Sequence, residues 1–475
     1  MLITLTAPAF AETWYIENGD ITVKASGTEG KNTVSQGNKK DVEDTNTIIT
    51  NQNQDKASSH TVTIDANDKN DKVEVTLKDV NIDTSSRNKA AVSVTGSGNT
   101  TIKLDGDNAL KSDTYRSGIY GSGSLTISGG TVTANGDDGG HGIYSRGSIT
   151  ISGGSTVTAN GRSGTISGGD GIRSAGGVTI SGGTVNATGG NGGTIAGGDG
   201  IRSGGGLTVS DGTVTAKGGN GDSKDGYGGD GIRSGGVVTI SGNTVNAAGG
   251  YGGKVGGYGI CSFDRVAISG GTVEAAGGNG STGGGSGIYS SVIDLSGSLE
   301  LTAKAGSPTG KALLQNGSEL DLDTIKDKLG PGAKVTVTDA NGETKQVSIP
   351  RPVEPEEPVI PGESSSSSDG GSSAPSAPAS PLPGLTVTDK SGAVISYTST
   401  QSGNTLTICV GRFTASLRAS LSALRPLRAE GIETITFQTI LCSTTLSVDE
   451  LLAMGGEDAE AVLTHRLTDS SLTVG

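Results

Sequence analysis

A repeated unit of about 28 residues is the feature that most constrains this chain. A Gly-Ile pair recurs along the middle of the sequence at intervals of 24 to 31 residues. Each pair begins a unit of similar sequence: Gly-Ile-x-Ser, then an apolar-Thr-apolar-Ser segment, then Gly-Gly-Thr-Val-x-Ala, then a Gly- and Asn-rich loop. A period of this length is typical of solenoids, propellers and arrays. The pairs are Gly118-Ile119, Gly142-Ile143, Gly171-Ile172, Gly200-Ile201, Gly231-Ile232, Gly259-Ile260 and Gly287-Ile288.

The text inside each unit predicts β-strands. Leu125 to Ser128 and Val178 to Ser181 alternate apolar and polar residues, as half-buried strands do, and no unit has a helical period. Three short strands in about 28 residues are too few for a four-stranded propeller blade. We therefore expect an all-β fold whose main portion is a parallel β-helix, with one unit per coil, and right-handed because crossover connections strongly favour that hand.

In a parallel β-helix, equivalent inward positions of neighbouring coils stack about 4.8 Å apart. The sequence therefore predicts ladders of like residues running along the solenoid. One ladder is Ile119, Ile143, Ile172, Ile201, Ile232, Ile260 and Ile288; a second is Ile127, Ile151, Ile180, Val209, Ile240 and Ile268; a third is Val132, Val157, Val185, Val214, Val245 and Val273. A ladder of small residues is expected near a corner, at Ala134, Ala159, Ala187, Ala216, Ala247 and Ala275.

Composition excludes several classes of protein. Glycine makes up 83 of the 475 residues without an every-third-residue period, which excludes collagen. A hydrophobic share of 31% and an aromatic share of 3% exclude a large conventional core and a polytopic membrane protein. The formal net charge of −14 argues against a nucleic-acid partner, which needs phosphate-neutralising cations.

The amino terminus has the pattern of a targeting segment. Leu2 to Phe10 is apolar but too short to span a bilayer, and Ala9-Phe10-Ala11 has the small-x-small form of a signal-peptidase site. We expect residues 1–11 to be the remnant of a signal peptide and the protein to be secreted or associated with the cell surface. The alternative is a buried first strand. No second apolar stretch of about 20 residues follows, so membrane insertion is not expected.

Composition shifts divide the rest of the chain into segments. Pro350 to Pro383 holds nine of the 13 prolines beside a run of serines, which is typical of a disordered extracellular linker. In the last segment we expect helices at 413–427 and 448–454, and Cys409 and Cys442 form either one disulfide or two buried thiols. The predicted segments are an irregular N-terminal cap (12–59), the β-helix (60–310), its C-terminal cap (311–349), a Pro/Ser linker (350–384) and a small α+β domain (385–475).

Three consecutive coils read Gly-Asp-Gly-Ile-Arg-Ser, which predicts an Asp ladder beside an Arg ladder. The aspartates are Asp170, Asp199 and Asp230. Carboxylates about 5 Å apart repel one another and need a cation, a proton or a metal beside them. Calcium is a candidate because it takes many oxygen ligands, including backbone carbonyls. The alternative is that each aspartate binds loop amides or pairs with a neighbouring arginine.

The position after each Gly-Ile pair predicts an outward row of tyrosine and arginine, interrupted by Cys261. Aromatic rings can stack on sugar faces, and guanidinium groups can bind hydroxyls or carboxylates, so the row is a candidate polysaccharide-binding strip. The alternative is ordinary solvent-exposed side chains. The residues of this Tyr/Arg strip are Tyr120, Tyr144, Arg173, Arg202, Arg233 and Tyr289.

Catalysis is not indicated by the sequence. His60, His141 and His465 are too scattered to support a Ser-His-Asp arrangement, and we expect His141 to be a hydrogen-bonding loop residue. The regular aspartates are multiplied by repetition, so none stands out as half of a glycosidase carboxylate pair.

A resemblance to a known family adds to these predictions. The strand-like segments at 73–77, 79–82, 91–94 and 101–104, followed by the Gly-Ile and Leu-Thr-Ile-Ser-Gly-Gly repeats, look like the secreted carbohydrate-binding β-helix proteins of Gram-positive bacteria. The resemblance covers roughly residues 60–310. It implies a polysaccharide-lyase-like fold, binding of plant cell-wall polysaccharide including acidic types, and calcium sites. No lyase catalytic base can be matched to a residue here.

The function expected from the sequence is therefore non-catalytic extracellular carbohydrate binding, with acidic polysaccharides among the candidate ligands and calcium as a candidate aid to binding. Two alternatives stay open: a surface adhesin or spacer without glycan affinity, and a calcium-dependent polysaccharide lyase.

Overall fold

The computed structural model has two compact units, residues 1–356 and 357–475, and each is described here by itself. The described residues are 12–26, 30–114 and 116–350 of the first unit, and 384–389, 394–395, 397–402, 404–410, 414–439, 443–456, 459–466 and 469–474 of the second. The predicted signal peptide (1–11) and nearly all of the predicted linker (350–384) lie outside them.

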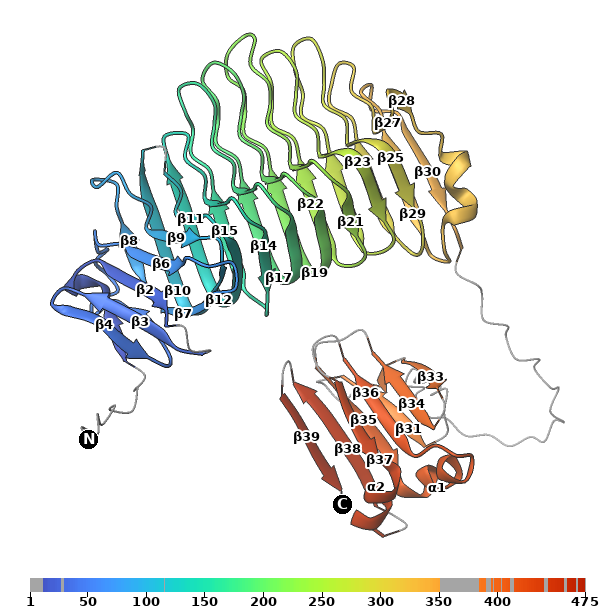
Figure 1. Ribbon diagram of the computed structural model, residues 1–475. Helices are drawn as coiled ribbons and strands as arrows, with labels where there is room; N and C mark the ends of the chain where they lie inside the picture. Colours follow the sequence, from blue (N-terminus) through green and yellow to red (C-terminus); the bar gives the residue numbers. More distant parts are fainter. Residues whose placement is uncertain are drawn as a thin grey trace, which may run out of the picture. The chain divides into compact units, whose positions relative to one another are not determined.

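The first unit is a parallel β-solenoid, as the repeat predicts (Figure 1). Its strands form three stacks, in which each strand pairs in parallel with its counterpart in the next coil. The Gly-Ile stack consists of β2 (Ile21–Ala25), β6 (Val62–Ala66), β9 (Val92–Gly96), β11 (Ile119–Gly121), β13 (Ile143–Ser145), β16 (Ile172–Ser174), β18 (Ile201–Ser203), β20 (Ile232–Ser234), β23 (Ile260–Ile268), β25 (Ile288–Leu295) and β27 (Leu313–Gln315).

Two further stacks complete each coil, and several long strands belong to both. The Ile-Ser stack consists of β1 (Thr13–Tyr15), β5 (Ile48–Thr50), β7 (Lys72–Lys78), β10 (Asn99–Thr114), β12 (Ser124–Asp137), β14 (Ile149–Ser152), β17 (Val178–Thr188), β19 (Leu207–Lys217) and β21 (Val238–Ile240), and continues into β23 and β25. The Thr-Val stack consists of β8 (Asn81–Asp83), β10, β12, β15 (Thr156–Asn160), β17, β19, β22 (Thr244–Ala248), β24 (Thr272–Ala276), β26 (Glu300–Lys304) and β29 (Lys334–Thr338).

The predicted ladders are confirmed. Ile172 pairs with Ile201, and Val185 with Val214, so like side chains stack from coil to coil. These side chains are fully buried and belong to a single hydrophobic cluster that runs through the solenoid. The small Ala187 and Ala216 are buried two residues after the valines. Inward residues therefore contact mainly their own kind in neighbouring coils.

The solenoid begins earlier in the chain than the predicted boundary at residue 60. Strands β1, β2 and β5, all within the predicted cap of residues 12–59, already pair in parallel with later strands. The hairpin of β3 (Asn32–Gln36) and β4 (Lys39–Asp44) pairs antiparallel beside β2, and a short 3-10 helix, η1 (Ile16–Asn18), joins β1 to β2. Trp14 is buried here and donates a hydrogen bond to Asp44 Oδ2 at 2.8 Å.

The C-terminal end of the solenoid is covered by antiparallel strands. Strand β28 (Ser318–Glu319) pairs with β27, and β30 (Thr344–Ser348) pairs along the whole of β29. A 3-10 helix, η2 (Leu322–Lys328), lies between them in sequence. Antiparallel pairing closes the free edge of β29, which would otherwise offer its hydrogen-bonding groups to another chain.

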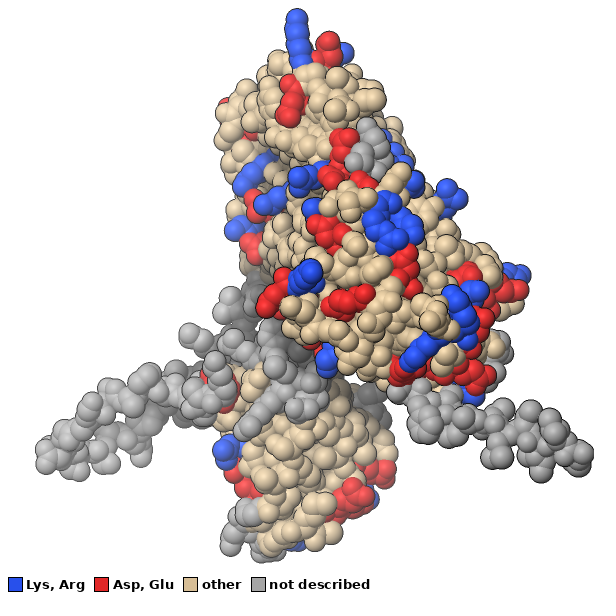
Figure 2. Space-filling model, turned by 90° about the vertical axis from the view of Figure 1, so that its left-hand side faces the viewer, with Lys and Arg blue, Asp and Glu red and all other residues tan. Residues whose placement is uncertain are grey.

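Charged side chains of both signs are intermingled on the face drawn in Figure 2. Exposed ion pairs occur within the solenoid, such as Lys103 with Glu74 at 2.6 Å and Lys78 with Asp105 at 2.9 Å. Exposed pairs of this kind contribute little to stability.

The second unit has two sheets and two helices. One sheet has the order β32 (Val394–Ile395), β31 (Leu385–Thr388), β35 (Thr414–Ser420), β38 (Glu460–Arg466), β39 (Asp469–Val474), and the other β33 (Thr398–Ser402), β34 (Thr405–Cys409), β36 (Thr434–Gln438), β37 (Ser443–Ser447). Helices α1 (Leu421–Ala429) and α2 (Val448–Met454) complete it. Within the described residues of the chain, the longest α-helix has nine residues, too short to cross a bilayer.

The helix predicted at 413–427 is wrong for the first half of that range and correct for the second. Residues 414–420 form strand β35, where Ala415, Leu417 and Ala419 alternate inward, and the helix begins only at Leu421. Ser420 marks the change, because its hydroxyl oxygen accepts a hydrogen bond from the Ala423 N–H at 3.3 Å and caps the helix. The helix predicted at 448–454 is α2.

Candidate groove beside the Tyr/Arg strip

The residues of the Tyr/Arg strip form one continuous ladder. Tyr120 pairs with Tyr144, which pairs with Arg173, and the row continues through Arg202, Arg233 and Cys261 to Tyr289. The tyrosine and arginine side chains are partly exposed, whereas Cys261 is buried. Because neighbouring strands lie about 4.8 Å apart, the three arginines follow one another along the backbone at about that interval.

The aspartate ladder lies directly beside the three arginines and is buried. Asp170, Asp199 and Asp230 are only 3 to 5% exposed. Each carboxylate accepts a hydrogen bond, through Oδ1, from the backbone N–H of the same position in the following coil. The donors are Asp199 N at 2.7 Å, Asp230 N at 2.8 Å and Tyr258 N at 2.7 Å. In the coil before the ladder, His141 Nδ1 has the equivalent role and accepts from Asp170 N at 2.8 Å.

The other oxygen of each aspartate faces the arginine three residues later. The distance from Arg Nη1 to Asp Oδ2 is 3.4 Å for Arg173, 3.6 Å for Arg202 and 3.1 Å for Arg233. The middle pair is an ion contact without a hydrogen bond, and Asp199 Oδ2 accepts none from any described residue. The middle of the ladder is therefore the least satisfied.

Burial controls the ionisation of this ladder. Loss of water around the carboxyls, followed by repulsion from the neighbouring carboxylate, raises the pKa of Asp199 and of Asp230 to about 7 each. Burial likewise raises the pKa of Asp170, against its backbone hydrogen bond and the charges of Arg173 and Arg202. Burial, together with the charges of the same two arginines, lowers the pKa of His141 to about 4, so His141 is neutral near pH 7.

A groove of about 350 Å³ opens over the middle of the ladder. It is lined by Arg202 and Arg233 of the Gly-Ile stack, by Asp199 and Asp230 just before those strands, and by the glycine-rich loops. Aromatic and apolar residues on those loops line the groove too: Tyr227, Val255 and Tyr258. Buried carboxyls, half-exposed guanidinium groups and phenol rings therefore meet in one concave site.

The glycine-rich loops form a wall made of backbone. This glycine wall comprises residues 161–170, 189–199, 218–230, 249–258 and 277–286, and Figure 1 shows the loops rising side by side above the strands. Gly219 N donates to Gly198 O, and Gly229 N donates to Gly219 O, each at 2.8 Å, and this alternation between the two legs of each loop repeats along the wall. The legs touch without side chains between them, since a Cβ on Gly189 would overlap the carbonyl oxygen of Gly198 in the other leg of the same loop. The wall is therefore thin and flat.

Aromatic side chains stand at both ends of the row of arginines. Tyr120 and Tyr144 have ring centroids 5.5 Å apart, and His141 lies at the same distance from Tyr144. At the other end, Tyr258 and Tyr289 stack with centroids 5.0 Å apart and planes inclined by 16°. The exposed Phe263 ring lies 5.0 Å from the Arg233 guanidinium carbon.

Three of these aromatic residues were not predicted from the sequence. Tyr258 occupies the position of the aspartates in the coil after Asp230, so its place on the ladder could have been read from the repeat. Tyr227 and Phe263 lie in stretches where the sequences of the units differ, and only the fold brings Tyr227 to the groove and Phe263 to Arg233. All of the predicted strip residues lie on one ladder, but Tyr120, Tyr144, Arg173 and Tyr289 lie outside the groove itself.

Calcium binding by Asp170, Asp199 and Asp230 stays a prediction. The observed neighbours of each carboxylate are a backbone N–H and an arginine, which is the alternative that the sequence left open. A divalent cation would compete with both donors for the same oxygens. Among the described residues, no group of three or more His, Cys, Asp or Glu side chains is placed to hold a metal ion.

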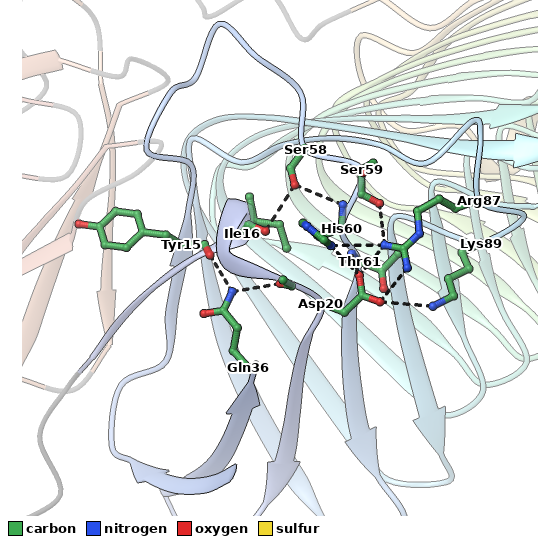
Figure 3. A network of polar contacts seen from close by, with 11 residues as sticks. Tyr15, Ile16, Asp20, Gln36, Ser58, Ser59, His60, Thr61, Arg87 and Lys89 are labelled. Carbon is green, nitrogen blue, oxygen red and sulfur yellow. Dashed lines mark hydrogen bonds and ion pairs between the residues drawn. The ribbon is translucent and has the colours of Figure 1, made fainter. Parts of the chain in front are cut away.

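A second polar cluster lies at the N-terminal end of the solenoid and is drawn in Figure 3. Asp20 accepts two hydrogen bonds from Arg87, at 2.6 and 3.0 Å, and one from Thr61 N at 2.9 Å, while His60 and Lys89 lie at 3.3 and 3.4 Å. These donors outweigh partial burial and hold the pKa of Asp20 well below its usual range. The cluster joins the start of β2 to the residues before β6 and β9, which gives it a structural role.

The remaining histidine and the two remaining cysteines lie in the second unit. His465 is buried between the hydroxyls of Thr439 and Thr444, at 3.2 and 3.0 Å, and against the Phe437 ring. Cys409 is a free thiol 3.5 Å from Gln438 Oε1, whereas Cys442 lies outside the described residues. Neither arrangement resembles a nucleophile with its base.

Comparison with known proteins supports the repeat. The model of a family described as Beta helix repeat matches residues 125–143 and 178–201. No curated protein and no solved structure matches the chain. The two matched segments run through β12 to β13 and β17 to β18, and so include strands of all three stacks. The chain is thus a β-helix protein whose coils are similar to the beta helix repeat.

Proposed function

We propose that this protein is a non-catalytic, extracellular carbohydrate-binding protein that holds an acidic polysaccharide along the Tyr/Arg strip. The observation that carries the proposal is the groove that the half-exposed side chains of Arg202 and Arg233 line together with Tyr227 and Val255. Guanidinium groups bind carboxylates with directional hydrogen bonds, and phenol rings stack on sugar faces.

The order of side chains along the strip supports an extended ligand. Three successive arginines are flanked by Tyr144 on one side and by the stacked Tyr258 and Tyr289 on the other. One coil advances about 4.8 Å along the solenoid, which is close to the length of one sugar unit in an extended chain. A polysaccharide parallel to the solenoid axis would therefore present one sugar to each coil, with carboxylates opposite the arginines.

The experiment is a binding titration of the full chain with polygalacturonate and with neutral cellulose oligosaccharides, each with calcium and with a chelator. We expect binding to polygalacturonate and little to the neutral sugar. The variant carrying Arg202→Gln and Arg233→Gln should lose at least about tenfold in affinity, as removal of charge-assisted hydrogen bonds implies. Arg146→Gln, an exposed change outside the groove, is the matched control.

Four outcomes are informative. Unchanged affinity of the double variant contradicts the groove as the binding face. Absence of binding to any glycan favours the spacer or adhesin function, and release of unsaturated sugar product favours a lyase. Binding that disappears with the chelator supports the predicted calcium assistance.

A further inference from the structure

A second groove lies at the N-terminal end of the solenoid, on the Ile-Ser stack. It has a volume of about 350 Å³, and we call it the N-terminal groove. It is lined by outward residues of β7 and β10, among them Glu74, Thr76 and Thr101, and by Asn32 and residues 45–47 of the first coils. It shares no lining residue with the groove beside the Tyr/Arg strip, so it is a separate candidate site.

The pairing of the strands leaves room for this groove. Strand β10 pairs with β7 from Lys72 onward, whereas the short β5, on the other side of β7, pairs only from Thr76 onward. None of the described strands therefore pairs with the start of β7 on that side. The side chain of Asn32 lies there instead, since its Nδ2 donates to the Glu74 carbonyl oxygen at 2.7 Å and to Thr47 Oγ1 at 2.9 Å. The groove is thus a gap in the Ile-Ser stack.

Asn32 brings an unsatisfied acceptor to the groove. Both hydrogens of its Nδ2 are engaged, which fixes the orientation of the side-chain amide. Its Oδ1 accepts no hydrogen bond from any residue that the structure describes, and the residue is only 6% exposed. A buried carbonyl oxygen without a donor is costly, because it has lost water and gained no partner. A ligand that places an N–H or O–H group on this oxygen would therefore bind favourably.

The charges around the N-terminal groove are of both signs. Lys72 and Glu74 line it, and Lys103 pairs with the Glu74 carboxylate at 2.6 Å. This mixture favours a neutral ligand over the acidic polysaccharide proposed for the Tyr/Arg strip. The rest of the lining is rich in hydroxyl and amide side chains, such as those of Thr101 and Asn99, which donate and accept hydrogen bonds as sugar hydroxyls do.

We propose that the N-terminal groove is a second sugar-binding site, which takes a neutral sugar that carries an acetamido group. The amide N–H of that group would donate to Asn32 Oδ1, and its carbonyl oxygen would accept from the side-chain amide of Asn46 or Asn99. Its methyl group would contact the methyl groups of the threonines. A hydroxyl in the same place cannot make all three contacts. The proposal goes beyond the proposed function, because it concerns another groove and another class of ligand.

A peptide also carries amide groups, but the N-terminal groove suits a sugar better. Peptides commonly bind an open sheet edge by adding a strand, through the N–H and C=O groups of that edge. At the open edge of β7, the Glu74 carbonyl oxygen already accepts a hydrogen bond from Asn32 Nδ2. The volume of about 350 Å³ lies in the range of small-molecule sites.

The test is calorimetric titration of the full chain with di-N-acetylchitobiose and with cellobiose, which has a hydroxyl in place of each acetamido group. We expect the affinity for the acetylated sugar to be at least about tenfold higher, since one hydrogen bond to a buried acceptor changes affinity by about that factor. N-acetylalanine methylamide has amide groups but no sugar ring, and it should bind no better than cellobiose.

Thr101→Lys tests the location. A lysine there can pair with Glu74, the register partner of Thr101, and so lie across the groove. The outward face of β10 already carries Lys103 two residues later, so the variant should fold. We expect it to lose at least about tenfold in affinity for the acetylated sugar. Thr150→Lys is the matched control, because Thr150 is a half-buried residue two coils further along the same ladder and outside the groove.

Asn32→Ala tests the acceptor itself. Its removal should abolish the preference for the acetylated sugar over cellobiose. The change also removes the hydrogen bonds to Glu74 and Thr47, so its melting temperature is measured beside the titration. If this variant does not fold, Thr101→Lys still decides the question.

The failures are distinguishable. No binding of the acetylated sugar, equal affinity for the two sugars, or unchanged affinity in Thr101→Lys overturns the proposal. Tighter binding of N-acetylalanine methylamide than of the acetylated sugar indicates a peptide site and overturns it too. Loss of acetylated-sugar binding in the Arg202→Gln and Arg233→Gln variant alone assigns that ligand to the other groove. The proposed function is tested separately, because Thr101→Lys should bind polygalacturonate as the native chain does.

Discussion

The carboxyls of Asp170, Asp199 and Asp230 show how repetition creates an unusual environment. One aspartate in a loop would simply bind amides, but three in register are buried one above another and repel each other. The repeat therefore places an ordinary loop residue in a row of buried carboxyls whose charge state depends on pH. The arginines of the same coils offset that charge incompletely, because they are half exposed to water.

The aspartate ladder predicts that the solenoid loses stability as pH rises. The folded pKa values of Asp199 and Asp230, about 7, exceed the ordinary value of 3.8, so the folded chain binds more protons than the unfolded chain between about pH 4 and pH 7. Stability should fall through this window, by at most about 1.4 kcal/mol per pH unit for each group. Thermal unfolding of the solenoid at several pH values measures the slope, and Asp199→Asn should flatten it. A melting temperature that rises from pH 5 to pH 7, with no flattening in the variant, would contradict this account.

Asp20 predicts the opposite slope at lower pH. Partial burial raises its pKa, but Arg87 and the Thr61 N–H together depress it further, so its contribution is complete above the ordinary pKa and is lost as pH falls below about 4. Arg87→Met should lower the stability of the solenoid by about 1 kcal/mol at neutral pH, since the pair is partly exposed. Denaturant unfolding compared with Arg146→Met checks this, and equal stability of the two variants would mean that the cluster does not secure the N-terminal coils.

Glycine allows the two legs of each loop to pack closely against each other. In the glycine wall the two legs of each loop hydrogen-bond to each other and to the next coil, in alternation, with nothing between them but backbone. Side chains would push the legs apart and open the groove. The wall thus accounts for much of the high glycine content.

The loss of stability on replacing a glycine should depend on what the added Cβ would contact. Gly198 of the wall and Gly242 outside it test this. Gly198→Ala places a methyl group on the Gly169 carbonyl, so we expect a loss of several kcal/mol or a displaced coil. At Gly242 the nearest atom to an added Cβ is Ser210 O at 3.4 Å, and Gly242→Ala should be nearly neutral. Neither position has a positive φ, which makes the pair a matched comparison. Equal melting temperatures for the two variants would show that the wall does not need the close approach.

The two units should behave as separate folding units. Each has its own hydrophobic cluster, one running through the solenoid and the other within the second unit. Truncating a fully buried side chain costs about 2 to 5 kcal/mol, and the cost belongs to the unit that loses the contacts. Ile201→Ala should therefore lower the melting temperature of the solenoid alone, and Leu424→Ala that of the second unit alone. Calorimetry that shows one transition shifted by both variants would contradict their independence.

Much of the solenoid could be predicted from the amino-acid sequence because each coil repeats the same local pattern. Ile172 and Ile201 occupy equivalent places in the text, and in a stack of parallel strands equivalent places must become neighbours. The Asp and Arg ladders followed for the same reason. The repeat thus established which residues neighbour one another along the axis, with no knowledge of the coil's cross-section.

Contacts across a coil depend on how the chain turns, and the repeat period of the sequence does not specify those turns. The fold alone brings Tyr227 and Val255 into one groove with Arg202, and it alone buries the aspartates deeply enough to raise their pKa values. The same holds where the sequence does not repeat. Residues 12–59 join the solenoid because β1, β2 and β5 pair in parallel with strands later in the chain. Residues 414–420 form a strand because β31 and β38 pair with it on either side. Local sequence specifies the ladders, whereas burial and pairing between distant segments create the groove and its chemistry.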